Sequence, residues 1–139
     1  MRYLLDTNTI SETLKRNPTA RLIAWLDGTP SSLCYISALT LGEVRKGVEK
    51  LPPGAQRDRI RNWLEVDLPA QFEGNILPVD TEVADRWGRL VAEQSATPRP
   101  IIDSLIAATA LAHGLMLVTR DADLVGIPGL EVINPWTMN

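Results

Sequence analysis

Short, mostly apolar segments alternate along this chain with longer segments whose apolar residues recur every three or four positions. The short segments read YLL at 3–5, LCYIS at 33–37, NILPV at 75–79, LMLVT at 115–119 and, more weakly, LEVINP at 130–135. An apolar run of this length is typical of a strand buried on both faces, and the longer spacing is typical of a surface helix. The alternation predicts an α/β fold, a three-layer sandwich with a central parallel sheet of four to five strands and helices on both faces.

The helices are predicted between these strands, at residues 8–15, 18–27, 38–51, 55–72, 81–94 and 101–114. We expect Thr81 to cap the start of one helix and Gly114 to close the last. The chain has 139 residues, and domains usually contain roughly 100–200. Residues 1–139 are therefore expected to form a single domain.

The single cysteine and the single histidine of the sequence exclude some kinds of bond and metal site. Cys34 is the only cysteine and His113 the only histidine, so an internal disulfide and a zinc site of His and Cys ligands are both excluded. A metal site here would need carboxylate ligands, which suit Mg²⁺ or Mn²⁺. No apolar run is long enough for a signal peptide or a membrane span, and we expect a cytoplasmic protein without membrane contact.

Four carboxylates are predicted to meet at one edge of the sheet. Asp6 follows the first strand and Asp121 the fourth, whereas Glu43 lies early on the helix after the second strand and Asp103 opens the helix before the fourth. The carboxyl ends of parallel strands and the helix N-termini share one edge of such a sheet. Carboxylates placed close together repel one another, so a divalent cation would stabilise this arrangement.

Each of these acids also has an ordinary explanation. Asp6 fits a helix cap, Asp103 is favourable in a first helical turn, and Glu43 fits an ion pair with Arg45, Lys46 or Lys50. Asp121 and Asp123 fit the cap of a short helix after the fourth strand. It is the shared location of the acids that indicates a site.

Polar neighbours of the acids are further candidates. Thr7, Asn8 and Thr119 could contact a metal, its waters or a phosphate, and they are equally common as turn residues. Arg120 fits a phosphate contact or an ion pair with a nearby acid.

Basic residues are concentrated in one region, although the formal net charge is −3. A solvated helical surface explains such a run best, and a phosphate-facing rim around an acidic site is the functional alternative. The run contains six basic residues against two acidic ones, Glu49 and Asp58, and comprises Arg45, Lys46, Lys50, Arg57, Arg59 and Arg61.

Several motifs together resemble the PIN-domain ribonucleases. They are LLDTNTISE, the Glu43 segment SALTLGEVRKGV, IIDSLIAATALAHGLMLVTRDADL and the closing VINPW, in this order over nearly the whole chain. More narrowly, the chain is similar to the VapC toxins of bacterial toxin–antitoxin pairs, in particular their FitB-like branch. The resemblance implies an acidic metal pocket of Asp6, Glu43, Asp103 and Asp121, with Asp123 close by. It does not settle how Asp121 and Asp123 divide their roles.

The activity implied by this resemblance is Mg²⁺- or Mn²⁺-dependent endonucleolytic cleavage of RNA, with tRNA as one family-level candidate. Asp6, Asp103 and Asp121 would hold the metal, and Glu43 would orient or deprotonate the attacking water. The implied products carry a 5′-phosphate and a 3′-hydroxyl. The family also implies a homodimer and a small antitoxin partner, which often carries the DNA-binding domain of an autoregulatory complex.

Two other functions remain open from the sequence. A phosphohydrolase of the haloacid dehalogenase type also begins with a strand that ends in Asp. That pattern needs a second Asp where this chain has Asn8, and a lysine that is missing near Asp121. A PIN-like module that only binds a partner is the non-enzymatic alternative.

Overall fold

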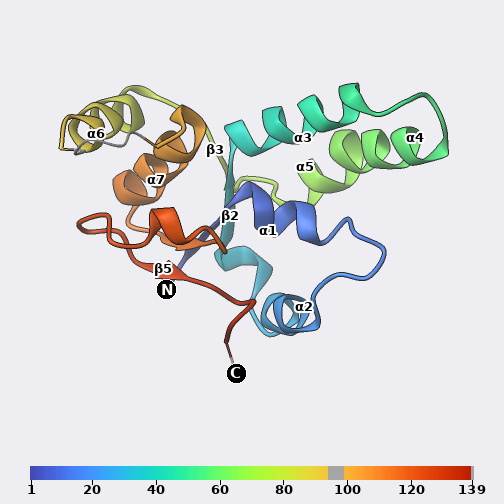
Figure 1. Cartoon of the computed structure of the whole chain (residues 1–139), viewed down its shortest axis with the longest axis horizontal. Coiled ribbons are helices and arrows are strands. Elements are labelled where there is room, and N and C mark those ends of the chain that lie inside the picture. The colour runs from blue at the N-terminus through green and yellow to red at the C-terminus, as the bar shows by residue number, and fades with distance from the viewer. Residues whose placement is uncertain (94–98, 139) are drawn as a thin grey trace.

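Five parallel strands form the centre of the molecule, in the order β3-β2-β1-β4-β5 (Figure 1). The computed structural model describes residues 1–93 and 99–138. Leu4 on the central strand pairs with Tyr35 on one side and Leu117 on the other. The prediction of a parallel sheet is confirmed, and the strands are β1 (Tyr3–Leu5), β2 (Cys34–Ser37), β3 (Ile76–Leu77), β4 (Met116–Val118) and β5 (Val132–Ile133).

Successive strand residues enter two different cores. Leu5, Ile36 and Val118 belong to one buried cluster, whereas Leu4 and Leu117 belong to a second cluster. Side chains alternate across a strand, so the two clusters lie on opposite faces of the sheet. Both faces are therefore buried, as the apolar strand sequences predict.

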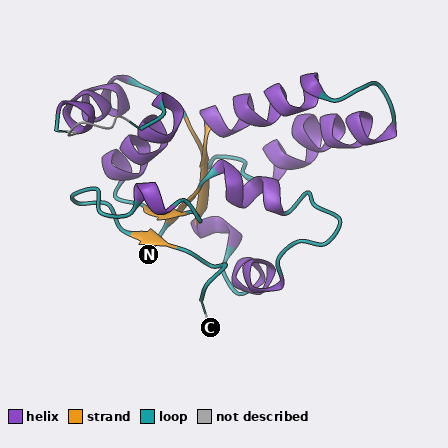
Figure 2. Cartoon of the chain, in the orientation of Figure 1, coloured by secondary structure: helices purple, strands orange, loops and turns teal. Residues whose placement is uncertain are grey.

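Helices cover both faces (Figure 2). Helices α6 (Thr81–Ala92) and α7 (Ile101–His113) pack together on one face of the sheet. Two short 3₁₀ helices, η1 (Ser31–Leu33) and η3 (Ala122–Leu124), lie in connecting segments. The longest helices described have 13 residues, and none of the described helices is long and apolar enough to cross a membrane. The other face carries α1 (Thr7–Glu12), α2 (Ala20–Asp27), α3 (Ala38–Lys50), α4 (Ala55–Asn62) and α5 (Leu68–Gln71).

Side chains at the sheet edge begin several helices. Ser37 accepts a hydrogen bond from the N–H of Leu39 at the start of α3. The cap of α6 is Asp80, which accepts from the N–H of Val83 at 2.9 Å, so the prediction of Thr81 as the cap is wrong by one residue. A carboxylate there also interacts favourably with the helix dipole. Gly114 closes α7 with φ of 65°, as predicted. Residue 94, the predicted end of α6, lies outside the described residues.

The helical segment after Gly54 contains an irregular turn. The π-helical turn η2 (Trp63–Asp67) joins α4 to α5 without a break, and the N–H of Leu68 donates to the carbonyl of Trp63, five residues back. Pro69 follows directly, and a proline removes one helical hydrogen bond and crowds the carbonyl four residues earlier. The wider turn accommodates this proline. The predicted helix over 55–72 is therefore right in extent but not in regularity.

The first helix is shorter than predicted because the loop after it has its own anchor. Helix α1 ends at Glu12, and Pro18 disfavours helical backbone at the residue before it. The Glu12 side chain is 4% exposed. Its carboxylate pairs with Lys15 at 2.9 Å and accepts bonds from the N–H and the hydroxyl of Thr19, at 3.0 and 2.9 Å. Lys15 and these bonds to Thr19 hold the pKa of Glu12 at about 2.

We predict that Glu12→Gln destabilises the protein at pH 7 by about 1–2 kcal/mol, because charge-assisted hydrogen bonds are lost. The pKa of Glu12 is lowered in the folded state, so its contribution is present above about pH 4.5 and is lost as the pH falls towards 2. Urea unfolding should show that the wild-type protein has a larger free energy of unfolding than the variant at pH 7, and that the difference disappears at pH 2–3. A matched control is Glu73→Gln, at an exposed acid. A gap that persists at low pH would contradict this role of the charge.

Candidate functional site

The sheet brings the predicted acids to its carboxyl edge. Asp6 directly follows the central strand β1, and Asp121 lies just beyond its neighbour β4. Asp103 lies in the first turn of α7, and Glu43 lies on α3, the helix that follows β2. Burial and the charges of the other three acids perturb the pKa of Asp103. The four carboxylates therefore lie close enough to interact electrostatically.

Asp6 is the most buried of these acids, at 4% exposure. Its Oδ1 accepts a hydrogen bond from the N–H of Thr7 at 2.8 Å, so Asp6 does cap α1. Its Oδ2 accepts a second bond from the Thr119 hydroxyl, also at 2.8 Å. Burial raises the pKa of Asp6, the two hydrogen bonds oppose that shift, and the charges of Glu43 and Asp121 add to it.

The Thr119 hydroxyl connects three of the candidate residues. It donates to Asp6 and accepts from the side-chain amide of Asn8 and from the N–H of Asp121, each at 3.0 Å. A hydroxyl has one donor and two acceptor positions, so every position is used. Thr119 is 1% exposed, and no bulk water replaces these bonds. Asn8 and Thr119 thus support the acids and are more than turn residues.

Thr7 positions the carboxylate of Glu43. Its hydroxyl donates to Glu43 Oε1 at 2.6 Å and lies 3.0 Å from the hydroxyl of Thr40. Because the one hydroxyl hydrogen of Thr7 is donated to the carboxylate of Glu43, the Thr40 hydroxyl must be the donor in the second bond. Glu43 makes no ion pair with a described residue, contrary to the simplest sequence interpretation. Thr40 was not singled out from the sequence, although it precedes Glu43 by three residues, a spacing that places both on one side of a helix.

Asp103 is the acid at this edge whose carboxyl pKa is raised furthest into the neutral range. Partial burial raises its pKa to about 6, and the negative charges of Asp6, Asp121, Glu43 and Asp123 add to that effect. The carboxylate is therefore held beside other carboxylates, and no positively charged side chain pairs with it within residues 1–93 and 99–138. Such a group gains from any bound cation.

Asp121 and Asp123 have different positions. Asp121 Oδ1 accepts from the N–H of Asp123 at 2.9 Å and caps η3, which was one of the two sequence interpretations. Asp123 is exposed, and its carbonyl accepts a bond from Arg99 at 2.8 Å. Arg120 lies over the ring of Trp136, 5.5 Å from its centre, and forms no ion pair with a described acid. Asp121 is thus the one of the two acids that is bonded to the Thr119 network.

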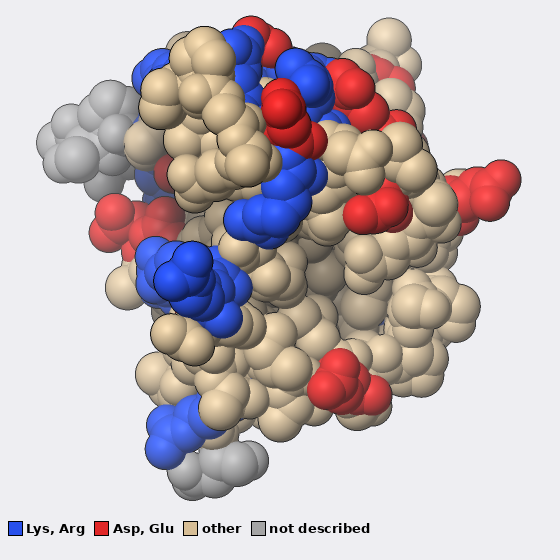
Figure 3. All heavy atoms as spheres, turned by 90° about the vertical axis from the view of Figure 1, so that its right-hand side faces the viewer, with Lys and Arg blue, Asp and Glu red and all other residues tan. Residues whose placement is uncertain are grey.

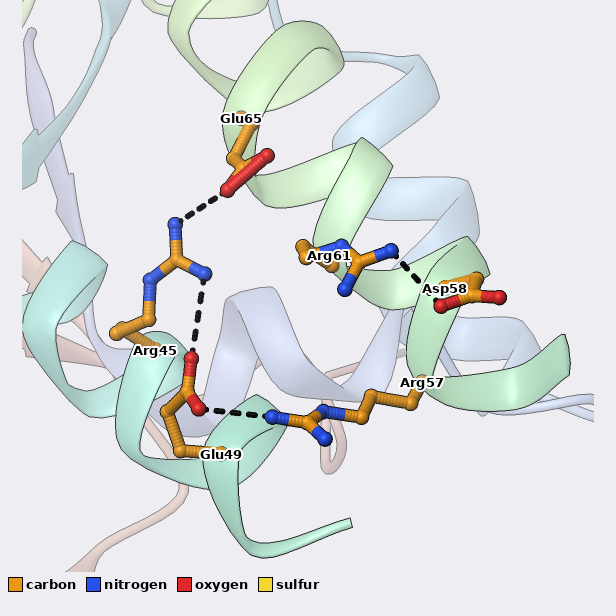
Figure 4. Close-up of polar contacts among 6 residues, drawn as sticks. All are labelled: Arg45, Glu49, Arg57, Asp58, Arg61 and Glu65. Atoms are coloured by element: carbon orange, nitrogen blue, oxygen red, sulfur yellow. Dashed lines mark hydrogen bonds and ion pairs between the residues drawn. The ribbon is translucent and has the colours of Figure 1, made fainter. Parts of the chain in front are cut away.

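The basic run lies on α3 and α4, and much of it is paired (Figure 4). Arg45 contacts Glu65 at 2.7 Å and Glu49 at 3.6 Å, Arg57 contacts Glu49 at 2.8 Å, and Arg61 contacts Asp58 at 2.8 Å. These pairs form the solvated surface favoured by the sequence. They leave those three guanidinium groups without a free charge for a phosphate.

The chemistry of the acids fits a hard divalent cation. All their ligand atoms are oxygens, and the repulsion at Asp103 would be relieved by a positive ion. Within the described residues, no three His, Cys, Asp or Glu side chains are arranged so as to hold one ion together. Mg²⁺ commonly binds through one or two carboxylates and keeps several waters, so a pair of these acids with water is the arrangement that fits.

Comparison with known proteins identifies the family. The model of the PIN domain matches residues 3–130. The "VapC ribonuclease Y4jK" of Sinorhizobium fredii is 38% identical over 96% of both chains, and the "Toxin FitB" of Neisseria gonorrhoeae is 38% identical over 96% of this chain and 97% of that one. The solved structure of FitAB bound to the DNA fragment IR36 contains a chain with a TM-score of 0.90 and 35% identity, covering 99% of this chain and 97% of that one.

We predict that Thr119→Val raises the pKa of Asp6 further and destabilises the protein by about 1–3 kcal/mol. The substitution keeps the shape but leaves Asn8 and the Asp121 N–H without an acceptor. NMR titration of the Asp6 carboxyl and urea unfolding would measure both effects. Thr119→Ser keeps the hydroxyl and should restore both values. An unchanged Asp6 pKa in the valine variant would contradict this role.

We also predict that Asp103→Asn stabilises the metal-free protein at pH 7–8 by about 1 kcal/mol, after allowance for solvent screening. The pKa of Asp103 is raised to about 6, so the folded protein loses stability as the pH rises from about 4 through 6. Unfolding in EDTA should therefore show a gain at pH 7 that disappears below pH 4. Asp85→Asn, at an exposed acid on α6, should show no such gain. A loss of stability at pH 7 would contradict the proposed repulsion.

Proposed function

This chain belongs to the PIN-domain family, and from that premise we propose that it is the toxin of a toxin–antitoxin pair and cleaves RNA as a metal-dependent endonuclease. Enzymes of this domain family generally depend on a divalent metal. Relatives of nearly equal length are named a ribonuclease and a toxin. The observation that carries the proposal is the placement of four acids at one edge of the sheet, Asp6, Glu43, Asp103 and Asp121. Thr7 bonds to Asp6 and Glu43, and Thr119 bonds to Asp6 and Asp121.

Each residue has a distinct role in the proposed mechanism. Asp6, Asp103 and Asp121 would share one or two Mg²⁺ or Mn²⁺ ions, each held by no more than a pair of these carboxylates and by water. The metal would balance the charge of the scissile phosphate and lower the pKa of water. Thr119 and the Thr7 N–H fix the orientation of the Asp6 carboxylate. The Thr7 hydroxyl occupies only Oε1 of Glu43, which leaves Oε2 to orient the attacking water or to accept its proton.

The proposed partner is an antitoxin. The chain of similar fold is solved within FitAB on DNA, and by analogy a complex of this chain with a DNA-binding antitoxin would regulate its own expression. The family resemblance implies self-association, so a homodimer remains a prediction. A cytoplasmic location also remains a prediction, because the proposed substrate is RNA. The PIN-domain match over residues 3–130 disfavours the phosphohydrolase alternative.

We predict that purified, antitoxin-free protein cleaves bacterial RNA in Mg²⁺ or Mn²⁺ and not in EDTA. Asp6→Ala and Asp103→Ala should each lower the cleavage rate at least about a hundredfold, since even a supporting group around a metal contributes roughly 10- to 100-fold. Gel analysis of total RNA and of tRNA, followed by mapping of the fragment ends, would identify the target and test for 5′-phosphate products. Asp85→Ala removes an exposed acid that pairs with Arg89 and is the matched control.

Three results would contradict the proposal in different ways. Cleavage that survives both substitutions would place the active site elsewhere or indicate a contaminant. Hydrolysis of a small phosphate ester without RNA cleavage would favour the phosphohydrolase. A folded protein that binds its antitoxin and cleaves neither substrate would be a catalytically silent binding module.

A further inference from the structure

Two adjoining cavities lie between the α1 segment and the α3–α4 pair, and one of them reaches the acidic edge at Glu43. One cavity of about 210 Å³ includes Glu43 in its lining, and a second of about 890 Å³ lies between the loop after α1 and the start of α4. Both cavities are lined by Ser11, Leu14 and Ile60. The two cavities therefore adjoin, and we refer to them together as the groove that begins beside Glu43.

The chemical character of the groove changes along its length. Its inner part, beside Glu43, is mostly aliphatic and contains Val44, Val48 and Leu51. Its outer part contains Lys15, Arg16 and Arg59. Figure 3 views the molecule from this end, where charged side chains of both signs crowd the upper surface over α3 and α4 and the surface is hollowed below them. An acidic site, an aliphatic passage and a basic end thus follow one another.

Two of the basic groups at the outer end carry uncompensated charge. Lys15 is paired with Glu12 at 2.9 Å. Arg16 and Arg59 are exposed, and neither forms an ion pair within residues 1–93 and 99–138. Arg61, on the same helix as Arg59, is paired with Asp58. The structure therefore separates Arg59 from its paired neighbours and places it with Arg16.

A site built from carboxylates cannot by itself supply affinity for a polyanion. The formal net charge is −3, and affinity for single-stranded nucleic acid comes largely from cations that replace counterions along the backbone. A guanidinium group suits this role because it binds a phosphate through two parallel hydrogen bonds. Arginine side chains that lie apart from the acids can bind the RNA backbone without neutralising the acidic site.

We propose that Arg16 and Arg59 form a phosphate-binding subsite for the RNA strand, at the end of the groove that leaves the acidic site at Glu43. This inference rests on the proposed function and adds residues that position the substrate away from the scissile bond. The aliphatic part of the groove contacts the nucleotides between the two sites. RNA long enough to reach both sites binds more tightly than RNA that covers the acidic edge alone.

The test compares the double variant Arg16→Gln/Arg59→Gln with Arg61→Gln, which removes an arginine from the same helix outside the groove. RNA binding is measured in EDTA over a range of salt concentrations, with short and long single-stranded oligonucleotides. Each phosphate contact contributes about −0.7 to the slope of log K against log salt. We expect the double variant to reduce the magnitude of that slope by about 1.4 and to lose the advantage of the longer RNA, while Arg61→Gln changes neither.

Cleavage kinetics provide a second measurement. The double variant should raise KM several-fold and leave kcat nearly unchanged, because the lost contacts are made equally in the ground state and the transition state. Both substitutions are at exposed residues, so the thermal midpoint should match that of Arg61→Gln.

The outcomes separate this inference from the proposed function. Absence of cleavage by the wild-type protein would contradict the proposed function, and the binding measurement in EDTA would still decide the role of the arginines. A double variant with the wild-type salt slope and KM would overturn this inference alone. Loss of antitoxin binding with unchanged RNA binding would also overturn it and would make the groove a protein-docking surface.

Discussion

The hydrogen bond from Thr119 to Asp6 joins the two strands on which the rest of the site depends. Asp6 ends the central strand, and Thr119 follows its neighbour, so a bond of 2.8 Å fixes one strand end against the other. Through the same hydroxyl, Asn8 and Asp121 are held in register with Asp6. The Asp6 carboxylate is buried, and each of its oxygens accepts a hydrogen bond. These bonds stabilise its charged form and partly oppose the rise in pKa that burial causes.

The acidic edge is favourable for function at the expense of stability. Among the described residues Asp103 has no positively charged partner, and its pKa of about 6 reflects burial and four negative neighbours. The two apolar clusters on either side of the sheet must offset that repulsion in the absence of metal. A divalent cation that binds only the folded protein would add stability through binding. Folding and metal binding are therefore linked through the same carboxylates.

The structure sorts the arginines of α3 and α4 into two sets. Arg45, Arg57 and Arg61 are neutralised by acids on their own or the adjacent helix. Arg59 is close to them in sequence but lines the groove with Arg16, which comes from the loop anchored by Glu12. Glu12 fixes the loop that carries Lys15 and Arg16, so its hydrogen bonds to Thr19 also determine where the basic end of the groove lies.

The sequence by itself determined the layered fold, the parallel sheet and the edge at which the acids lie. Those features follow from local apolar patterns and from the rule that strand ends and helix starts share an edge. The αL residue Gly114 was likewise predictable, because its conformation is a local property. Side-chain contacts beyond the next helical turn were decided only by the tertiary structure. Examples are the bond of Thr40 to Thr7, the anchor of Glu12 on Thr19, and the choice of which arginines remain unpaired. A hydrogen bond or ion pair needs its partner within about 3–4 Å, and the sequence specifies neighbours along the chain but not distances across it.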